Sequence, residues 1–474
     1  MSRTTTGLAT LFFFALVLRV AAIVVFAAPA DRPQTYEHGE IAQNLLAGRG
    51  FTVTFLGVEG PTSQQAPFVP ALLAASCALT AGDMPQAIWL VQLLQACTGA
   101  VLTVVVAQLA WSLVPTNRLT GWIAGYGAAL YPPHVYMSTH IQAAPWAALV
   151  LTLLLACVLA RGATTWRTFI TAGLLAGWLL LIEPILALAL PICALALGLR
   201  AARTNNPRFS ITPLLTRPAL RAMTVMTLTT LAVVTPWLVR NYRVHGEFVF
   251  IKSTFGYAFW QANHPLSWGT DKIPKPSVEA IRTAHDGSWR GRSEAIWQAR
   301  HETIYIDDLL LKPYGYERFA GLSEPARSRL LGAEAKAFIT ADPLRYGQLC
   351  LRRLSYFLWR DATNPKTADI IYRLSTAAWL GLVIAGLFVT RRQLMAWWPL
   401  WSVFLVVTIF HALTIVSARF RIPLEPLTFV WAASAVTSLF APAARFLGAR
   451  YSRWGVYLPR RAAHACGVSA TSGS

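Results

Sequence analysis

Ten long apolar segments constrain the fold of this chain more than any other feature of its sequence. A helix of about 20 apolar residues crosses the ~30 Å hydrocarbon core of a bilayer. Of the 474 residues, 55% are hydrophobic and only 13% are charged, whereas about a quarter of the residues of a soluble domain are charged. The sequence therefore predicts an all-α polytopic membrane protein with about ten transmembrane helices. These are expected at 7–29, 87–113, 119–133, 141–160, 168–183, 185–199, 222–239, 374–390, 395–412 and 423–440.

Ionisable residues inside these segments are the first candidates for a special role. Arg19 lies in the middle of 7–29, which also lacks a clear cleavage site before Asp31, so we expect this segment to be a retained helix and not a signal peptide. Glu183 and Glu425 also lie at membrane depth. Such groups are costly in a bilayer and usually pair or line a cavity. Structural pairing, for instance of Arg19 with Glu183, is as consistent with the sequence as a functional site.

The distribution of charge predicts the topology. If the N-terminus is cytoplasmic, the inside segments hold sixteen basic residues and no Asp or Glu; they are 1–6, 114–118, 161–167, 200–221, 391–394 and 441–474. Cytoplasmic loops are enriched in Lys and Arg. We therefore expect a bacterial cytoplasmic (inner) membrane protein with both termini inside. The net charge of +20 then reflects topology, and no nucleic-acid partner is expected.

Four regions follow from this topology. Residues 1–239 form an N-terminal transmembrane module with a first outer loop at 30–86, and 240–373 form a long outer (periplasmic) segment. Residues 374–440 form the C-terminal transmembrane helices, and 441–474 form a basic cytoplasmic tail. Within the long outer segment, 322–360 has the pattern of one amphipathic helix. The outer parts are expected to add juxtamembrane helices and a small mixed segment to the bundle.

The first outer loop contains a pair of acids with regular spacing. From Tyr36 the chain has helical periodicity, and Gly48 ends it. Glu37 and Glu40 are three residues apart, so both carboxylates share one face of this helix. Asp31 lies just before it. A surface helix whose acids are simply solvated is the plain alternative.

Basic residues gather at two further outer positions. In 235–265, Pro236-Trp237 is expected to close a helix, Arg240, Asn241 and Arg243 follow, and a β-like run at 247–252 leads to a turn at Gly256. Arginine binds phosphate oxygens bidentately, although snorkelling to lipid headgroups explains the same pattern. In 417–426, Arg419 and Arg421 lie at the outer face.

Several catalytic patterns are missing from the sequence. It contains no GxxxxGK[ST] loop, no HExxH and no GxSxG, and the six cysteines have neither metal-site nor disulfide spacing. With no acid on the cytoplasmic side, chemistry that uses a cytosolic metal-bound nucleotide donor is excluded. A lipid-phosphate-linked donor, which is available outside, fits this constraint.

Five ordered motifs resemble the GT-C glycosyltransferase superfamily, in the bacterial branch related to lipid A aminoarabinose transferase and to protein O-mannosyltransferases. The motifs cover most of the chain. They are YEHGEIAQNLLAGRGF (36–51), APFVPALL (66–73), LYPPHVYMS (130–138), TPWLVRNYRVHGEFVFI (235–251) with FWQANHP (259–265), and ARFRIPLEP (418–426).

The resemblance implies a GT-C fold and transfer of a hexose or pentose from a polyprenyl-phosphate sugar to an acceptor hydroxyl, at a site facing outside. A carboxylate removes the proton of the acceptor. Relatives often have Asp where this chain has Gln34, so Glu37 is the expected base, with Glu40 and then Asp31 as alternatives.

The remaining site residues are expected in two groups. The donor phosphate is expected to contact Arg240, Arg243, Arg419, Arg421 and Lys252, and the substrate pocket to include Tyr36, His38, Asn241, Asn263 and His264. No metal ligands and no definite cofactor are expected, and a divalent cation is left open. The expected partners are the polyprenyl-phosphate sugar, membrane lipid and an acceptor that is a glycan, a lipid or a protein.

Two other functions fit the same sequence. A lipid or sugar transporter, or a flippase, also needs many helices and buried charges, but such proteins usually contain internal repeats, which we do not detect. A non-catalytic member of the family is the third hypothesis, because of Gln34.

Overall fold

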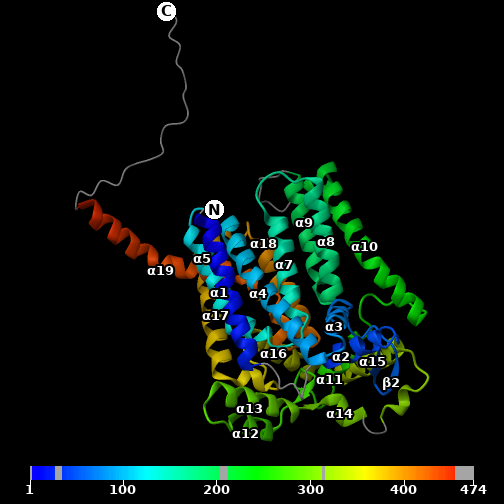
Figure 1. The fold of residues 1–474 in the computed structure, drawn as a ribbon. Helices are drawn as coiled ribbons and strands as arrows, with labels where there is room; N and C mark the ends of the chain where they lie inside the picture. Colours follow the sequence, from blue (N-terminus) through cyan, green and yellow to red (C-terminus); the bar gives the residue numbers. More distant parts are fainter. Residues whose placement is uncertain (1–2, 27–34, 203–211, 312–314, 454–474) are drawn as a thin grey trace, which may run out of the picture.

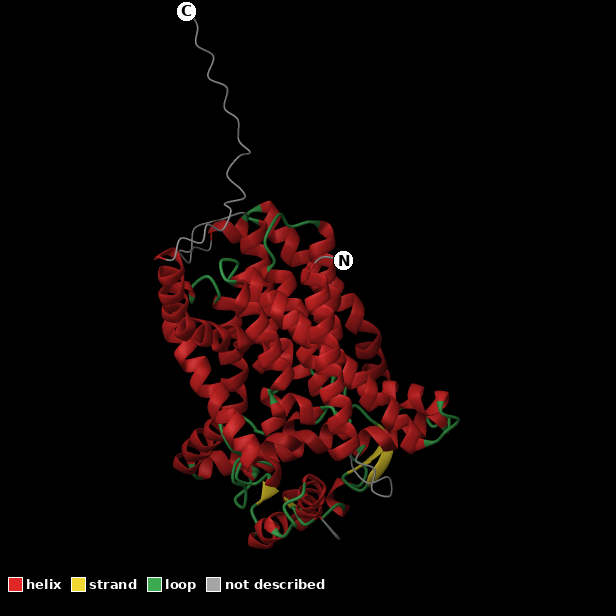
Figure 2. Cartoon of the chain, turned by 60° about the vertical axis from the view of Figure 1, so that its left-hand side comes forward, coloured by secondary structure: helices red, strands yellow, loops and turns green. Residues whose placement is uncertain are grey.

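The computed structural model of the protein describes residues 3–26, 35–202, 212–311 and 315–453, and helices dominate it (Figure 1; Figure 2). In this described part, the strands form two short antiparallel pairs. The first pair is a hairpin, and helices separate the two strands of the second along the chain. One pairs Thr52 with Pro61, and the other pairs Lys272 with Tyr305 across the helices between them. The all-α class predicted from the sequence is therefore confirmed.

A bundle of apolar helices makes up most of the molecule. Within the described residues, five helical segments are long and apolar enough to cross a membrane: α1, α4, η1 with α9, α10 and α17. Four further helices, α3, α7, α8 and α18, are apolar but shorter. The elements of the bundle are α1 (Arg3–Phe26), α3 (Phe68–Leu79), α4 (Met84–Leu113), α5 (Arg118–Leu130), α6 (Pro132–Met137), α7 (Ala144–Leu159), α8 (Trp166–Ile182), η1 (Pro184–Ala189), α9 (Leu190–Ala201), η2 (Thr212–Leu215), α10 (Arg217–His245), α17 (Ile370–Val389), η5 (Arg391–Gln393), α18 (Trp398–Leu413), η6 (Ala418–Arg421) and α19 (Glu425–Arg453).

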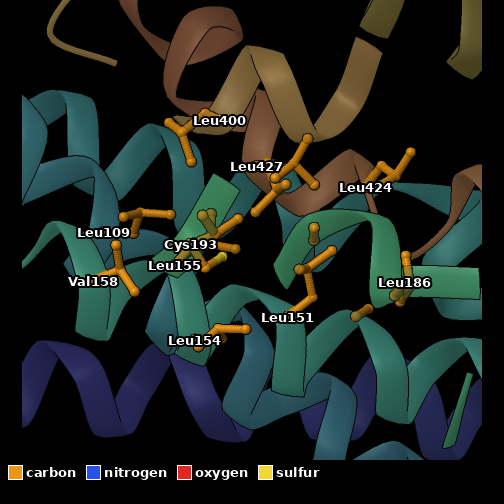
Figure 3. Close-up of a cluster of buried hydrophobic side chains, with 14 of the residues drawn as sticks. Leu109, Leu151, Leu154, Leu155, Val158, Leu186, Cys193, Leu400, Leu424 and Leu427 are labelled. Atoms are coloured by element: carbon orange, nitrogen blue, oxygen red, sulfur yellow. The ribbon is translucent and has the colours of Figure 1, made fainter. Parts of the chain in front are cut away.

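The centre of the bundle is a continuous apolar core. Leu109, Leu151, Leu155 and Leu400, from α4, α7 and α18, point toward one another there (Figure 3). All four are buried, so they contact protein and not lipid. Van der Waals packing is the main force between helices in a bilayer, because lipid is as apolar as leucine.

Shorter elements cover one end of the bundle. The helices α12 to α14 lie at the end opposite to the start of α1 (Figure 1). This arrangement is the one that the charge-based topology requires, whereas the sidedness itself stays a prediction. The elements are α2 (Tyr36–Leu46), β1 (Thr52–Phe55), β2 (Val58–Pro61), α11 (Phe255–Asn263), β3 (Lys272–Ile273), α12 (Pro276–Thr283), α13 (Trp289–His301), β4 (Ile304–Tyr305), α14 (Ile306–Leu311), η3 (Glu317–Phe319), α15 (Glu324–Ala341), α16 (Pro343–Leu358) and η4 (Pro365–Ala368).

The helix expected to close at Pro236-Trp237 continues for more than two further turns. α10 ends only at His245, where Gly246 adopts a left-handed φ of +69° and donates to the carbonyl of Tyr242. Proline is tolerated inside membrane helices, since neighbouring groups satisfy the freed carbonyl. The boundary drawn between 239 and 240 therefore falls inside α10.

Three further local expectations are wrong. The run 247–252 is not a strand, and Gly256 lies inside α11 and not in a turn. A Cβ at Gly256 would lie 2.0 Å from the carbonyl oxygen of Ser328, so the glycine is needed where α11 and α15 touch. The single helix expected at 322–360 is two helices, because Pro343 cannot donate a hydrogen bond and disfavours helix at Asp342.

Close contact between α17 and α19 should make Gly386 sensitive to a single methyl group. A Cβ there would lie 2.0 Å from the carbonyl oxygen of Trp431, so Gly386→Ala forces the helices apart. Overpacking of this kind costs about 1–3 kcal/mol. Gly381→Ala is the control, because nothing lies within 4 Å of its Cβ position on the same helix. Thermal unfolding in detergent should show a lower Tm for Gly386→Ala alone; equal Tm values for the two variants would contradict this packing.

Candidate active site

A cavity of about 1120 Å³ lies where the apolar helices meet the shorter elements that cover one end of the bundle. Apolar side chains from α1, α6 and α18 form part of its wall, among them Ala22, Val135 and Phe410. Charged side chains from α2, α13, η4 and η6 form another part. The cavity thus places an apolar surface next to a charged one.

The charged part contains equal numbers of cations and carboxylates. Two of the cations are neutralised nearby, since Lys272 pairs with Asp271 at 2.5 Å and Arg292 lies 3.8 Å from Asp369. The full set is Lys252, Lys272, Arg292, Arg300, Lys366 and Arg419 with Glu37, Glu183, Asp271, Asp307, Asp308 and Asp369.

Neutral groups hold two other cations in place. The ammonium of Lys252 donates to Oε1 of Gln65 at 3.2 Å, and Nη1 of Arg419 donates to Oε1 of Gln142 at 3.0 Å. An amide oxygen orients a cation without cancelling its charge. Lys252 and Arg419 are therefore positioned to bind an anion.

Lys366 is a third cation of this kind. Its Nζ hydrogen-bonds to Nε2 of His140, a neutral partner when the imidazole accepts. The pKa of Lys366 is well below its ordinary value, first because of burial and then because Arg300 and Arg419 repel a further positive charge. An anion bound between these groups would attract each of them and would favour the charged form of Lys366.

Arg300 extends the cationic wall toward α2. Its guanidinium lies 4.7 Å from the ring centre of Tyr36 and 5.7 Å from that of Trp297. It also hydrogen-bonds to the side chain of Tyr305. Tyr36 is thereby held at the cavity wall through a cation–π contact.

Glu37 is the predicted base that the structure places in the cavity. Its Oε2 accepts a hydrogen bond of 3.4 Å from Nε2 of Gln65, the same amide that holds Lys252. Burial lowers the pKa of Lys252, and Glu183 and Glu37 act against that effect. Both carboxylates therefore lie within electrostatic reach of this lysine.

His38 lines the cavity beside Glu37 and is buried. Burial, followed by the charges of Lys252 and Arg419, lowers its pKa to about 3. The imidazole is therefore neutral at physiological pH. It can donate or accept a hydrogen bond there, but it adds no charge to the site.

Glu40 has a different environment from Glu37, although both lie on α2. Its Oε1 accepts a hydrogen bond of 2.7 Å from the backbone N–H of Thr54 and so joins α2 to the first hairpin. Glu40 does not belong to the cavity lining, and Asp31 lies outside the described residues.

Arg240 and Asn241 bind the protein's own backbone. Arg240 donates from Nη1 to the carbonyl of Thr62 at 2.5 Å and from Nη2 to that of Phe51 at 3.0 Å. Asn241 donates to the carbonyl of Ile251 at 3.2 Å. Arg240 thus holds both ends of the first hairpin, and Asn241 holds the chain after α10. Neither residue lines the cavity.

Arg421, unlike Arg419, is buried within the protein. It pairs with Glu425 at 2.6 Å and donates to the carbonyl of Phe357 at 2.8 Å. Arg243 is exposed and lies outside the cavity lining.

Asn263 and His264 also lie outside the cavity lining. Asn263 accepts a hydrogen bond of 2.6 Å from Arg353. His264 accepts one from the backbone N–H of Leu266 at 3.1 Å. Both residues order the chain after α11.

The arginine and the two acids that the sequence places at membrane depth make different contacts. Arg19 donates to the carbonyls of Ala15 at 3.1 Å and Ala128 at 3.5 Å, which joins α1 to α5. Glu183 lines the cavity instead of pairing with Arg19, and Glu425 pairs with Arg421.

Sequence motifs did not reveal several charged residues of this site. Lys272, Arg292, Arg300, Lys366 and Asp307 come from the long outer segment. No recognised motif covers these positions, and the only sequence signal for them is the abundance of charge in 240–373. Among the described residues, no group of three or more His, Cys, Asp or Glu side chains is arranged to hold a metal ion.

Comparisons with known proteins give one likeness. No protein-family model matches the chain, and no curated protein sequence matches it. Among solved structures, the chain is similar to ArnT from Cupriavidus metallidurans bound to undecaprenyl phosphate, with a TM-score of 0.38, 15% identity, and coverage of 95% of this chain and 81% of that chain. For the apo state of the same protein the TM-score is 0.35, with 15% identity and coverage of 92% and 78%. A likeness at this level assigns no function by itself.

The contacts of Arg240 predict a structural effect of its removal. Arg240→Ala leaves the carbonyls of Thr62 and Phe51 without their donor, which should lower the free energy of unfolding by about 2–4 kcal/mol. Arg243→Ala, three residues later and exposed, should change it by less than about 0.5 kcal/mol. Chemical unfolding in detergent measures both. Unchanged stability of Arg240→Ala would show that these hydrogen bonds contribute little.

Proposed function

We propose that this chain is a membrane glycosyltransferase that moves a hexose or pentose from a polyprenyl-phosphate donor to an acceptor hydroxyl at the outer face of the bacterial cytoplasmic membrane. The sequence motifs that resemble GT-C enzymes motivate this proposal. The observation that carries it is the single cavity in which an apolar wall, a group of cations and Glu37 lie together.

Each part of the cavity matches one part of such a donor. The apolar wall suits a prenyl chain, whose burial is favourable by about 0.8 kcal/mol for each CH₂ group. Lys252, Lys366 and Arg419 suit the phosphate, because their partners are neutral. Arg300 adds a guanidinium, which matches phosphate geometry.

The transfer step uses Glu37 as general base. The carboxylate takes the proton of the acceptor hydroxyl, and the oxygen forms a new bond to the anomeric carbon. The bond between that carbon and the phosphate oxygen breaks, and its electron pair stays on the leaving polyprenyl phosphate. Cations already in place around that phosphate stabilise the charge as it develops.

Glu37→Gln should lower the rate of transfer by about 10²–10⁴-fold, because the amide cannot accept the proton. Glu40→Gln is the matched control on the same helix, since its amide oxygen can still accept the N–H of Thr54. Transfer from undecaprenyl-phosphate sugars is measured with the purified full-length protein at matched expression and Tm.

Near-normal transfer by Glu37→Gln would assign the base elsewhere, and Glu183→Gln then tests the other acid close to Lys252. Loss of transfer in the Glu40→Gln control, with an unchanged Tm, would also contradict the assignment.

Removing a phosphate cation should weaken both donor binding and turnover. Arg419→Gln and Lys366→Met should each raise the KM for the donor and lower kcat, by about 10²-fold or more in kcat/KM, because charge on the leaving phosphate is less well stabilised. Arg290→Gln is the control, as its side chain is 88% exposed and lies outside the cavity lining. Equal kinetics for all three variants would show that the phosphate binds elsewhere.

A further inference from the structure

Three side chains that the transfer step does not use form a hydrogen-bonded group on the cavity wall. The hydroxyl of Tyr257 donates to Oδ2 of Asp307 at 2.9 Å, and Nε2 of Gln261 donates to Oδ1 of Asp307 at 3.0 Å. The same Nε2 donates to the hydroxyl of Tyr257, also at 3.0 Å. All three side chains line the cavity.

These internal hydrogen bonds decide what the group can offer a ligand. Both N–H bonds of the Gln261 amide and the O–H of Tyr257 are already used within the group. What is left are lone pairs on the carboxylate of Asp307 and on the amide oxygen of Gln261. A surface of acceptors binds groups that carry hydrogen-bond donors, of which the hydroxyls of a sugar are an example.

The group lies close to both the proposed base and the cationic wall. Burial raises the pKa of Tyr257 well above its ordinary value, and Asp307, Glu37 and Asp271 add to the increase, so these acids lie within electrostatic range of its hydroxyl. Asp307 follows Tyr305 by two residues, and Tyr305 pairs with Lys272 where β4 pairs with β3.

A sugar carried by the donor must lie in this region. The anomeric carbon has to face the acceptor activated by Glu37 on one side and the phosphate held by the cations on the other. The ring that carries this carbon is one bond away from the phosphate oxygen. Asp307 lines the same cavity as Glu37 and follows Tyr305, whose side chain hydrogen-bonds to Arg300, so its carboxylate is available to that ring.

We propose that Asp307, oriented by Tyr257 and Gln261, forms a subsite that binds the hydroxyl groups of the donor's sugar ring. This inference rests on the proposed function and deepens it. The sugar is then a hexose or pentose whose ring hydroxyls donate to a fixed carboxylate. Asp307 takes no part in proton transfer, and its effect is on the affinity for the sugar.

The test measures binding of undecaprenyl phosphate with and without a sugar. Dissociation constants are obtained by native mass spectrometry for bare undecaprenyl phosphate and for a set of undecaprenyl-phosphate-linked hexoses and pentoses. The wild-type protein should bind at least one sugar-linked form more tightly than the bare lipid. Asp307→Asn should weaken that form by about tenfold or more, because hydrogen bonds to a carboxylate are lost, and should leave the bare lipid unchanged.

Two control variants make the result specific. Glu302→Gln changes an exposed carboxylate that faces Lys275 at 3.5 Å, outside the cavity lining, and should affect neither ligand. Tyr257→Phe keeps the carboxylate but loses one of its orienting donors, so a smaller loss confined to the sugar-linked form is expected. Unchanged binding of the bare lipid also shows that each variant is folded.

The possible failures can be told apart. Equal weakening of both ligands by Asp307→Asn, or no weakening of either, overturns the sugar subsite, whereas binding of the bare lipid by the wild-type protein still supports the proposed phosphate site. The absence of any sugar-dependent gain in the wild-type protein also overturns it. If the wild-type protein binds none of these lipids, the proposed function itself is contradicted.

Discussion

The buried ion pair of Arg421 with Glu425 is the interaction on which the geometry of the cavity depends. Glu425 also accepts hydrogen bonds from Tyr131 at 3.0 Å and contacts His134 at 2.9 Å, so the start of α19 is joined to α6. Removing one partner of such a buried pair typically costs about 3–5 kcal/mol, because a charge is left without compensation. η6 is short, and this pair fixes its position.

The fixed position of η6 explains why two nearby arginines have opposite roles. Arg421 turns into the protein, where it donates to the carbonyls of Phe357 and Leu358 at 2.8 and 2.6 Å. Arg419, two residues earlier, lines the cavity and contacts Gln142. Arg421 thus fixes the position of η6, and Arg419 is available to a molecule in the cavity.

Apolar periodicity predicted the helical class correctly, but it did not locate the ends of elements. α10 passes through Pro236 because a membrane helix tolerates proline, and the predicted helix at 322–360 divides because Pro343 lies in a polar segment where Asp342 can cap a new helix through the N–H of Arg345. The same residue type therefore had opposite effects in two environments. Sequence pattern alone does not separate them.

The site was predicted in part for a related reason. Glu37 and Arg419 stand in motifs and line the cavity, and Lys252, directly after a motif, lines it too. Arg240 stands in a motif but holds backbone carbonyls instead. Sequence identifies an arginine at the outer face but does not show which acceptors satisfy its donors. Lys366 had no motif, and it reaches the cavity because the fold brings η4 against α13 and places its ammonium over Tyr136 of α6 and Trp297 of α13.

Arg300 and Arg419 lie within electrostatic range of Lys366, and their positive charges repel it. The pKa of Lys366 is lowered by burial and by neighbouring cations, so its charged form is destabilised relative to a lysine in water. The phosphate of the proposed donor attracts Lys366, Arg300 and Arg419 alike, and this attraction offsets their mutual repulsion. Bound phosphate must therefore raise the pKa of Lys366, and by linkage its binding weakens as pH rises through that higher pKa. Lys366 and Arg419 hydrogen-bond to the neutral groups of His140 and Gln142, so the proposed phosphate is the group that compensates their charges.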